Sequence, residues 1–203
     1  MQRLMLFSGL CLLLACSDAS DTMAVDNAAP WRQPGDVIDS ILPMAEHERR
    51  FREGLSEVDA LQGGAANREE LARRFLAAVA ARDTAALQSM LVNRAEFAWL
   101  VFPSHVYREP PYQLDPALFW MQLGAESAKG MGRVLERHGG QAIAFHSLEC
   151  QRDTLQLTDQ GLQFWGPCRF RYTANDSTLT RKLFGTVLEC DGQAKVLSYS
   201  NDF

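Results

Sequence analysis

The sequence predicts an α+β fold, in which amino-terminal helices are followed by a four-stranded antiparallel meander sheet that packs against them. Up to about residue 140, apolar residues recur at helical spacing between capping residues. From Gln141 to Phe203 that period is absent, and strand-like runs alternate with turn signals. The composition is that of a globular protein, because 47% of the residues are hydrophobic and the formal net charge is only −5. The negative charge balance argues against a nucleic-acid partner.

An accessory helical segment is predicted over residues 36–62. It begins with a short helix over 36–42. A longer amphipathic helix is then expected over 45–61, ended by Gly63-Gly64. The apolar residues of this second helix are Phe51, Leu55, Val58 and Leu61, and charged residues surround them.

Residues 67–203 are predicted to form the main α+β domain, and capping residues mark its helices. The expected helices run from Asn67 to about Arg82, from Asp83 or Thr84 to Leu91, and from Asp115-Pro116 to about His138. The segment 94–102 fits a helical turn or a strand equally well. Three glycines within the long helix, Gly124, Gly130 and Gly132, indicate a close backbone crossing, with a hinge or a ligand approach as the alternative.

The four strands are expected over 142–157, 162–173, 178–190 and 193–201, joined by hairpin turns. Gly166-Pro167 interrupts the second strand, which predicts a β-bulge there.

The strand register also predicts a disulfide. If the first hairpin turns near residue 160, Cys150 lies opposite a residue within two positions of Cys168, close enough for a Cys150–Cys168 bridge. Cys190 falls at a turn far along the sheet and is expected to stay outside the bridge. No Cys-x-x-Cys motif is present and the histidines have no recognised ligand spacing, so neither a metal nor another cofactor is predicted.

The amino terminus reads as a signal peptide over residues 1–15. Arg3 precedes an apolar run of about 12 residues that ends at Ala15, and a polar stretch follows. This run is shorter than the roughly 20 residues that a membrane-spanning helix needs. Residues 16–35 are small, polar and rich in turn formers, which predicts a flexible tether.

Leu13-Leu14-Ala15-Cys16 resembles the lipobox of bacterial lipoproteins. The resemblance implies that Cys16 carries acyl chains, palmitate among them, and becomes the first residue of the mature protein. Ser17 at the next position implies the outer membrane, with the body facing the periplasm. The alternative is an ordinary signal peptide with an incidental cysteine, or an apolar terminus that is never cleaved.

The order of elements in residues 67–203 is similar to that of the NTF2-like (SnoaL-like, cystatin-fold) superfamily, in which helices precede a long twisted antiparallel sheet. That resemblance implies a conical pocket. It does not fix the function, because the superfamily includes enzymes and many non-catalytic binding domains. No catalytic motif of a known class is present in the sequence.

Aromatic and polar residues gather over positions 97–120, and they are the candidate ligand-binding residues: Trp99, His105, Tyr107, Arg108, Tyr112 and Trp120. Rings of this kind more often fill a core, which is the alternative interpretation. The leading hypothesis is a membrane-anchored, non-catalytic envelope lipoprotein that binds a small apolar ligand or an envelope protein. The alternatives are an NTF2-like enzyme with acid/base chemistry on a small hydrophobic substrate, and a structural module that dimerises through the outer face of the sheet.

Overall fold

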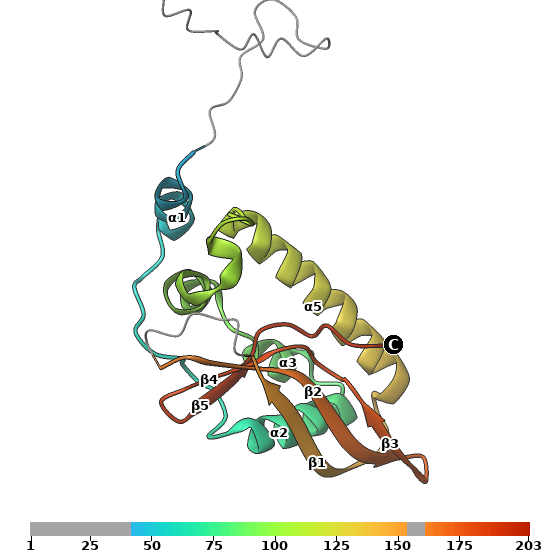
Figure 1. Cartoon of the computed structure of the whole chain (residues 1–203). Helices are drawn as coiled ribbons and strands as arrows, with labels where there is room; N and C mark the ends of the chain where they lie inside the picture. The colour runs from blue at the N-terminus through green and yellow to red at the C-terminus, as the bar shows by residue number, and fades with distance from the viewer. Residues whose placement is uncertain (1–41, 154–160) are drawn as a thin grey trace, which may run out of the picture. The chain divides into compact units, whose positions relative to one another are not determined.

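The computed structural model of the chain describes residues 42–153 and 161–203. The predicted signal peptide 1–15, the lipid attachment site Cys16, the tether 16–35 and nearly all of the helix 36–42 lie outside the described residues. Within the described residues, helices are followed by an antiparallel sheet, so the predicted α+β class is confirmed (Figure 1).

Eight helical elements precede the sheet within the described residues. The α-helices are α1 (Met44–Arg52), α2 (Arg68–Ala81), α3 (Thr84–Ser89), α4 (Arg94–Glu96) and α5 (Pro116–His138). Between α4 and α5 lie the π-helix η1 (Phe97–Val101) and the 3-10 helices η2 (Phe102–Ser104) and η3 (Val106–Arg108). The ambiguous segment 94–102 is therefore helical.

The predicted caps begin three of these helices. The side-chain oxygen of Asn67 accepts the Glu70 amide at 2.9 Å, and that of Asp83 accepts the Ala86 amide at 2.9 Å. Asp115 accepts the amides of Ala117 and Leu118. Each cap satisfies amides that the first helical turn leaves without an intrahelical partner, and this is why the predicted starts agree with the structure.

The prediction of one helix over 45–61 was wrong, because α1 ends at Arg52. Glu53 is extended at the C-cap and Gly54 has a φ of 76°, which turns the chain out of the helix. Leu61 is nevertheless buried, and Leu55 and Val58 pack beside it, in a non-helical segment. The spacing of Leu55, Val58 and Leu61 therefore resembled a helical period although the segment that carries them is not helical.

The sheet contains β1 (Ile143–Arg152), β2 (Gln163–Ala174), β3 (Ser177–Arg181), β4 (Val187–Cys190) and β5 (Gln193–Val196). β2 pairs with β1 on one side and with both β3 and β4 on the other, and β5 pairs with β4. The register of β1 on β2 shifts between the Cys150 and Arg152 positions, and the extra residue belongs to β2, as predicted at Gly166-Pro167.

The continuous strand predicted over 178–190 was wrong, because the chain breaks into β3 and β4. The consecutive residues Leu183 and Phe184 are both buried, which an alternating strand does not allow. Gly185 then donates its amide to the Ser198 carbonyl at 2.8 Å, under the chain that follows β5. That following chain leaves the sheet at Leu197, short of the predicted end at 201.

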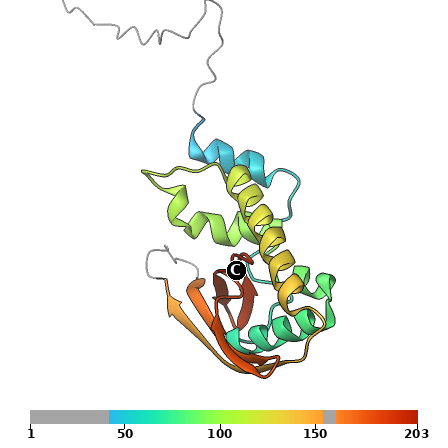
Figure 2. The same cartoon turned by 90° about the vertical axis from the view of Figure 1, so that its right-hand side faces the viewer.

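Two hydrophobic clusters form the core. The sheet cluster joins α2 to the inner face of the sheet and includes Phe75, Phe170, Phe184 and Tyr199. The α1 cluster joins α1, η1, η2 and the start of α5 to β4 and the start of β2, and includes Phe51, Phe97, Phe102, Phe119 and Phe164. In both views, α1 and α2 lie at opposite ends of this body, and α5 extends from one end to the other (Figures 1 and 2).

A buried ion pair lies where the two clusters meet. The Lys195 ammonium on β5 is 2.8 Å from the Glu96 carboxylate on α4, and both side chains are almost fully buried. The same carboxylate accepts the amides of Gln62 at 2.7 Å and Asn93 at 2.8 Å. All the polar groups of the pair therefore have partners, as burial of charges requires.

The described helices include none that is long and apolar enough to cross a membrane.

Candidate functional site

Three of the predicted site residues form one aromatic group at the start of α5. The ring centroids of His105 and Tyr107 are 4.8 Å apart, and those of Tyr107 and Tyr112 are 5.2 Å apart. The Phe119 ring on α5 lies 4.7 Å from His105 and 5.3 Å from Tyr107. The loop 105–112 is thus fixed to the first turn of α5 by ring contacts.

His105 is the buried member of this group. Its Nδ1 accepts the Tyr107 amide at 3.2 Å, so its proton is on Nε2 in the neutral form. Burial lowers the pKa of His105 to about 4, although Asp153 acts in the opposite direction. His105 is therefore neutral near pH 7, and its packing against Phe119 and Phe164 gives it a structural role.

The other members are exposed, and two residues of α5 join them. The large apolar side chains that stay exposed among the described residues are Tyr107 at 38%, Tyr112 at 58%, Leu118 at 40% and Met121 at 62%. We call these four residues the apolar patch. All lie within the loop before α5 and its first two turns, whereas the rest of the described surface leaves such side chains at least partly covered.

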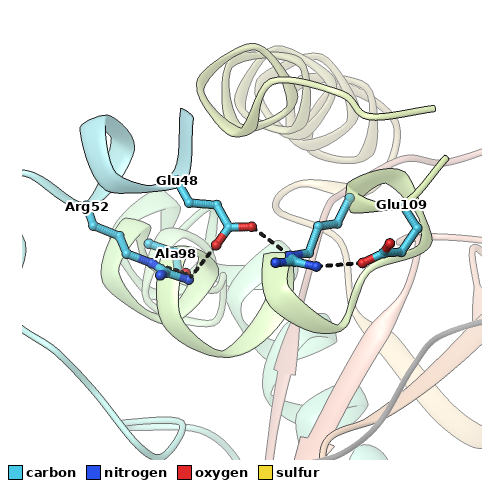
Figure 3. Close-up of polar contacts among 5 residues, drawn as sticks. Glu48, Arg52, Ala98 and Glu109 are labelled. Atoms are coloured by element: carbon cyan, nitrogen blue, oxygen red, sulfur yellow. Dashed lines mark hydrogen bonds and ion pairs between the residues drawn. The ribbon is translucent and has the colours of Figure 1, made fainter. Parts of the chain in front are cut away.

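Arg108 faces away from the rings and holds α1 against this loop. Its Nε donates to the Glu48 carboxylate at 2.6 Å, and its Nη1 donates to Glu109 at 2.5 Å. Figure 3 shows the Glu48 carboxylate between two guanidinium groups. The second belongs to Arg52, whose Nη2 lies 3.4 Å from Glu48 Oε2. Arg52 also donates twice to the Ala98 carbonyl at 3.1 Å.

A second ion pair connects α1 with α5. The Nδ1 of His47 lies 2.6 Å from the Asp115 carboxylate, which caps α5 with its other oxygen. Together with the Glu48–Arg108 contact, this pair places the first half of α1 beside the start of α5 and the loop before it (Figure 2).

The two predicted tryptophans lie apart from the tyrosines. The Arg52 guanidinium covers the Trp99 ring at 4.4 Å, and the buried Nε1 of Trp99 has no hydrogen-bond partner among the described residues. The Trp120 ring packs on Phe97 at 5.2 Å. The predicted set of six is therefore divided between an exposed tyrosine pair, a buried histidine, an ion-pair network and two packed tryptophans.

Trp120 also lines an open hollow of about 380 Å³ between α5 and the segment 88–94. Leu91, Leu123, Met131 and Leu197 supply most of its apolar lining. Gly124 leaves its floor open, because a side chain at this position would meet nothing within 4 Å. The hollow is large enough for a small apolar molecule.

A buried histidine–tyrosine pair lies at the other end of α5. The Tyr172 hydroxyl is 3.0 Å from Nε2 of His138, and the rings meet edge to face at 5.4 Å. Burial lowers the pKa of His138 and raises the pKa of Tyr172, so both are neutral near pH 7. Phe203 packs against His138 at 5.8 Å. The His138–Tyr172 pair is therefore a packing contact within the core.

The predicted disulfide Cys150–Cys168 is present, and the two cysteines are direct neighbours across β1 and β2. Cys190 is a buried thiol outside this bridge, and its Sγ lies 3.7 Å from Asp191 Oδ2. Burial raises the pKa of the Cys190 thiol, so it is protonated near pH 7. Within residues 42–153 and 161–203, no group of three or more acidic, cysteine or histidine residues has the arrangement of a metal site.

The chain matches no family model, no curated protein and no solved structure. The resemblances to bacterial lipoproteins and to the NTF2-like superfamily therefore remain predictions.

Sequence reasoning missed the residues that complete the site. Leu118 and Met121 are three apart on α5 and lie off its buried stripe, which runs through Phe119, Ser127 and Val134. That offset is visible in the sequence and could have identified them. Glu48 could not have been found in this way, because its partner Arg108 is 60 residues away.

Proposed function

We propose that the protein is a lipid-anchored component of the bacterial envelope, held in the outer membrane by Cys16 and facing the periplasm, with a non-catalytic binding domain. The support for the anchor is the sequence of residues 1–20, in which a short apolar run ends at a cysteine and a polar stretch follows. The Cys150–Cys168 disulfide is consistent with an oxidising compartment.

We further propose that the apolar patch is the binding surface. The observation that carries this proposal is that the exposed large apolar side chains of the described residues are confined to positions 107–121. Exposed aromatic side chains with a polar hydroxyl are typical of recognition surfaces, because the ring loses water on binding while the hydroxyl keeps a hydrogen bond. Outside this region the exposed surface carries mainly polar side chains and offers less binding energy.

We propose an NTF2-like arrangement for the domain, with a filled interior. α2 followed by α3 before an antiparallel sheet supports this arrangement. The space between α2 and the sheet is occupied by the rings of Phe75, Phe170 and Phe184, which contact one another, and by the ring of Tyr199, which contacts Phe75. This packing favours binding on the outside of the domain over chemistry in a central pocket.

The anchor is tested by the mass of the amino-terminal peptide of the protein purified from bacterial membranes. We expect a peptide that begins at Cys16 and carries acyl chains, and we expect Cys16→Ala to move the protein from the membrane fraction. An unmodified thiol at Cys16 in a protein outside the envelope would refute this part of the proposal.

The binding surface is tested by thermal shift with fractions of an envelope extract. We expect a fraction that raises the melting temperature of the wild-type protein and leaves the Tyr107→Ser/Tyr112→Ser variant unchanged. Without ligand the variant should melt below the wild type, because Tyr107 also packs against His105 and Phe119. Each shift is therefore measured against the ligand-free protein of the same sequence. If every active fraction stabilises the variant equally, the apolar patch is not the binding surface.

A further inference from the structure

We infer that the occupant of the apolar patch is the surface of the lipid bilayer in which the protein is anchored. The inference rests on the proposed function, because it takes the acyl anchor at Cys16 as given. It adds the chemical identity of the partner and the orientation of the body on the membrane.

The position of the patch is the first argument. The described chain begins just before α1, and the His47–Asp115 and Glu48–Arg108 contacts hold α1 against the start of α5 and the loop before it. Tyr107 and Tyr112 belong to that loop, while Leu118 and Met121 belong to that start of α5. The patch therefore belongs to the segments that α1, the first described helix, contacts.

The length of the preceding chain sets how far the body can lie from the bilayer. Residues 16–41 are 26 residues, which span at most about 90 Å when fully extended. The acylated end thus keeps the body near the membrane at all times. This raises the effective concentration of the bilayer at the patch, so a weak contact is sufficient.

The chemistry of the patch fits a membrane–water interface. Tyrosine is enriched at the level of the lipid headgroups, because its ring is apolar and its hydroxyl stays hydrated. Leu118 and Met121 add aliphatic surface one helical turn apart on α5, and both are at least 40% exposed.

The charges near the patch predict little dependence on anionic lipid. Arg49 and Arg50 pair with Glu46, and Arg108 pairs with Glu48 and Glu109. These cations are already matched by carboxylates, so attraction to lipid phosphates is small. We therefore expect the contact to depend on apolar surface and to change little with salt.

The size of the patch favours a bilayer over a protein. A stable protein–protein interface buries more than about 1,000 Å² in total, with 20 or more residues on each side. Four exposed side chains are a small core for such an interface. They are sufficient for a bilayer contact that an acyl anchor already maintains.

The experiment uses the mature lipidated protein in vesicles of phosphatidylethanolamine and phosphatidylglycerol. A nitroxide label is attached at Met121→Cys and, as a matched exposed control at the other end of the body, at Thr180→Cys on β3. Cys150 and Cys168 are in a disulfide and Cys190 is buried, which directs labelling to the introduced cysteine. Relaxation by oxygen and by a water-soluble nickel chelate reports the depth of each label.

We expect the label at 121 to be protected from the nickel chelate several-fold more than the label at 180, with little change between low and high salt. Tyr107→Ser/Tyr112→Ser should remove most of that protection, and Tyr107→Trp/Tyr112→Trp should restore it. A cooperative thermal unfolding transition would show that the variants remain folded.

Equal exposure of the two labels in vesicles would overturn the inference. It would also be overturned if the label at 121 were exposed in vesicles and protected only in whole envelopes, because a protein would then be the occupant. The mass of the amino-terminal peptide from the same sample separates these results from failure of the proposed anchor. An acylated peptide with an exposed label refutes the bilayer contact alone, whereas an unmodified Cys16 refutes the proposed function.

Discussion

The sheet cluster and the α1 cluster are built differently, although both are rich in phenylalanine. In the sheet cluster, backbone polar groups are satisfied by strand pairing and the rings of Phe75, Phe170 and Phe184 fill the space beneath. In the α1 cluster, short helices meet at their ends, and charged side chains connect them. Glu48, Arg52 and Arg108 are examples, with part of each side chain buried.

This difference between the two clusters suggests that strand pairing holds one region together while the other region carries the proposed binding surface. At the sheet cluster, strand pairing provides partners for backbone polar groups. The outer face of the sheet carries polar side chains such as Arg169, Arg171 and Thr180. The α1 cluster depends on side-chain contacts and also carries the whole apolar patch. The proposed binding surface therefore lies in the region whose short helices are joined by side-chain contacts rather than by strand pairing.

The largest effect is expected from breaking the ion pair between the two clusters. Lys195→Met leaves the Glu96 carboxylate buried without its cation, which should lower the free energy of unfolding by about 3–5 kcal/mol. Urea denaturation measures this change. The double variant Glu96→Gln/Lys195→Met removes the charge and should recover part of the loss. A cost below about 1 kcal/mol for Lys195→Met would show that the clusters do not depend on this contact.

The next effect concerns the disulfide and tests the sheet cluster alone. Removal of the bridge by Cys150→Ser/Cys168→Ser reopens a loop with a sequence separation of 18, which should cost about 3 kcal/mol. The same urea experiment applies. Labels on the apolar patch should be unaffected, and a change in their exposure would mean that the two clusters are coupled through β2.

The pH dependence of stability tests the α1 cluster. Since burial lowers the pKa of His105 to about 4, the folded state keeps this histidine neutral while the unfolded chain takes up a proton near pH 6.5. Stability is therefore lost as pH falls from about 6.5 toward 4. Between pH 7 and pH 5 this amounts to about 2 kcal/mol. His105→Asn should remove that part of the slope in urea titrations, and an unchanged slope would contradict the assignment.

Two glycines of α5, one beside each cluster, are expected to give effects of opposite sign, and the effect at Gly124 is the smallest of all. At Gly130 a Cβ would lie 1.7 Å from the Tyr199 carbonyl oxygen, so Gly130→Ala should cost about 1–3 kcal/mol. At Gly124 a Cβ meets nothing within 4 Å, so Gly124→Ala should gain about 0.5–1 kcal/mol from helix propensity. Melting temperatures that move in the same direction for both variants would contradict this account.

These glycines show how far the sequence could predict the fold. Three glycines in one helix suggested a close backbone crossing, and the structure places that crossing at Gly130 against Tyr199, while Gly124 and Gly132 are open. Local signals were reliable where one or two residues determine geometry, as Asn67 and Asp115 do at helix starts. The bulge followed from Gly166-Pro167 inside a strand-like run, and the Cys150–Cys168 pairing followed from strand register.

Long-range contacts account for what could not be predicted. The Arg52–Ala98 contact at the end of α1 joins residues 46 positions apart and no local pattern contains it, whereas the turn at Gly54 that ends the helix is local. The break between β3 and β4 depends on the passage of Ser198 beside Gly185. Of the candidate site, the exposed tyrosines were identified, but Glu48 and Met121 were missed because their surroundings come from other segments.

One consequence follows from the pairing of β2 with three other strands. β2 forms a ladder with β1 on one edge, and its other edge is divided between β3 and β4. A fluctuation that frees the whole of β2 must therefore open the ladders with β1, β3 and β4 together, whereas β1 and β3 can fray separately. Hydrogen exchange in β2 is thus limited by global unfolding, and its amides would retain protium longest when the protein is transferred to heavy water.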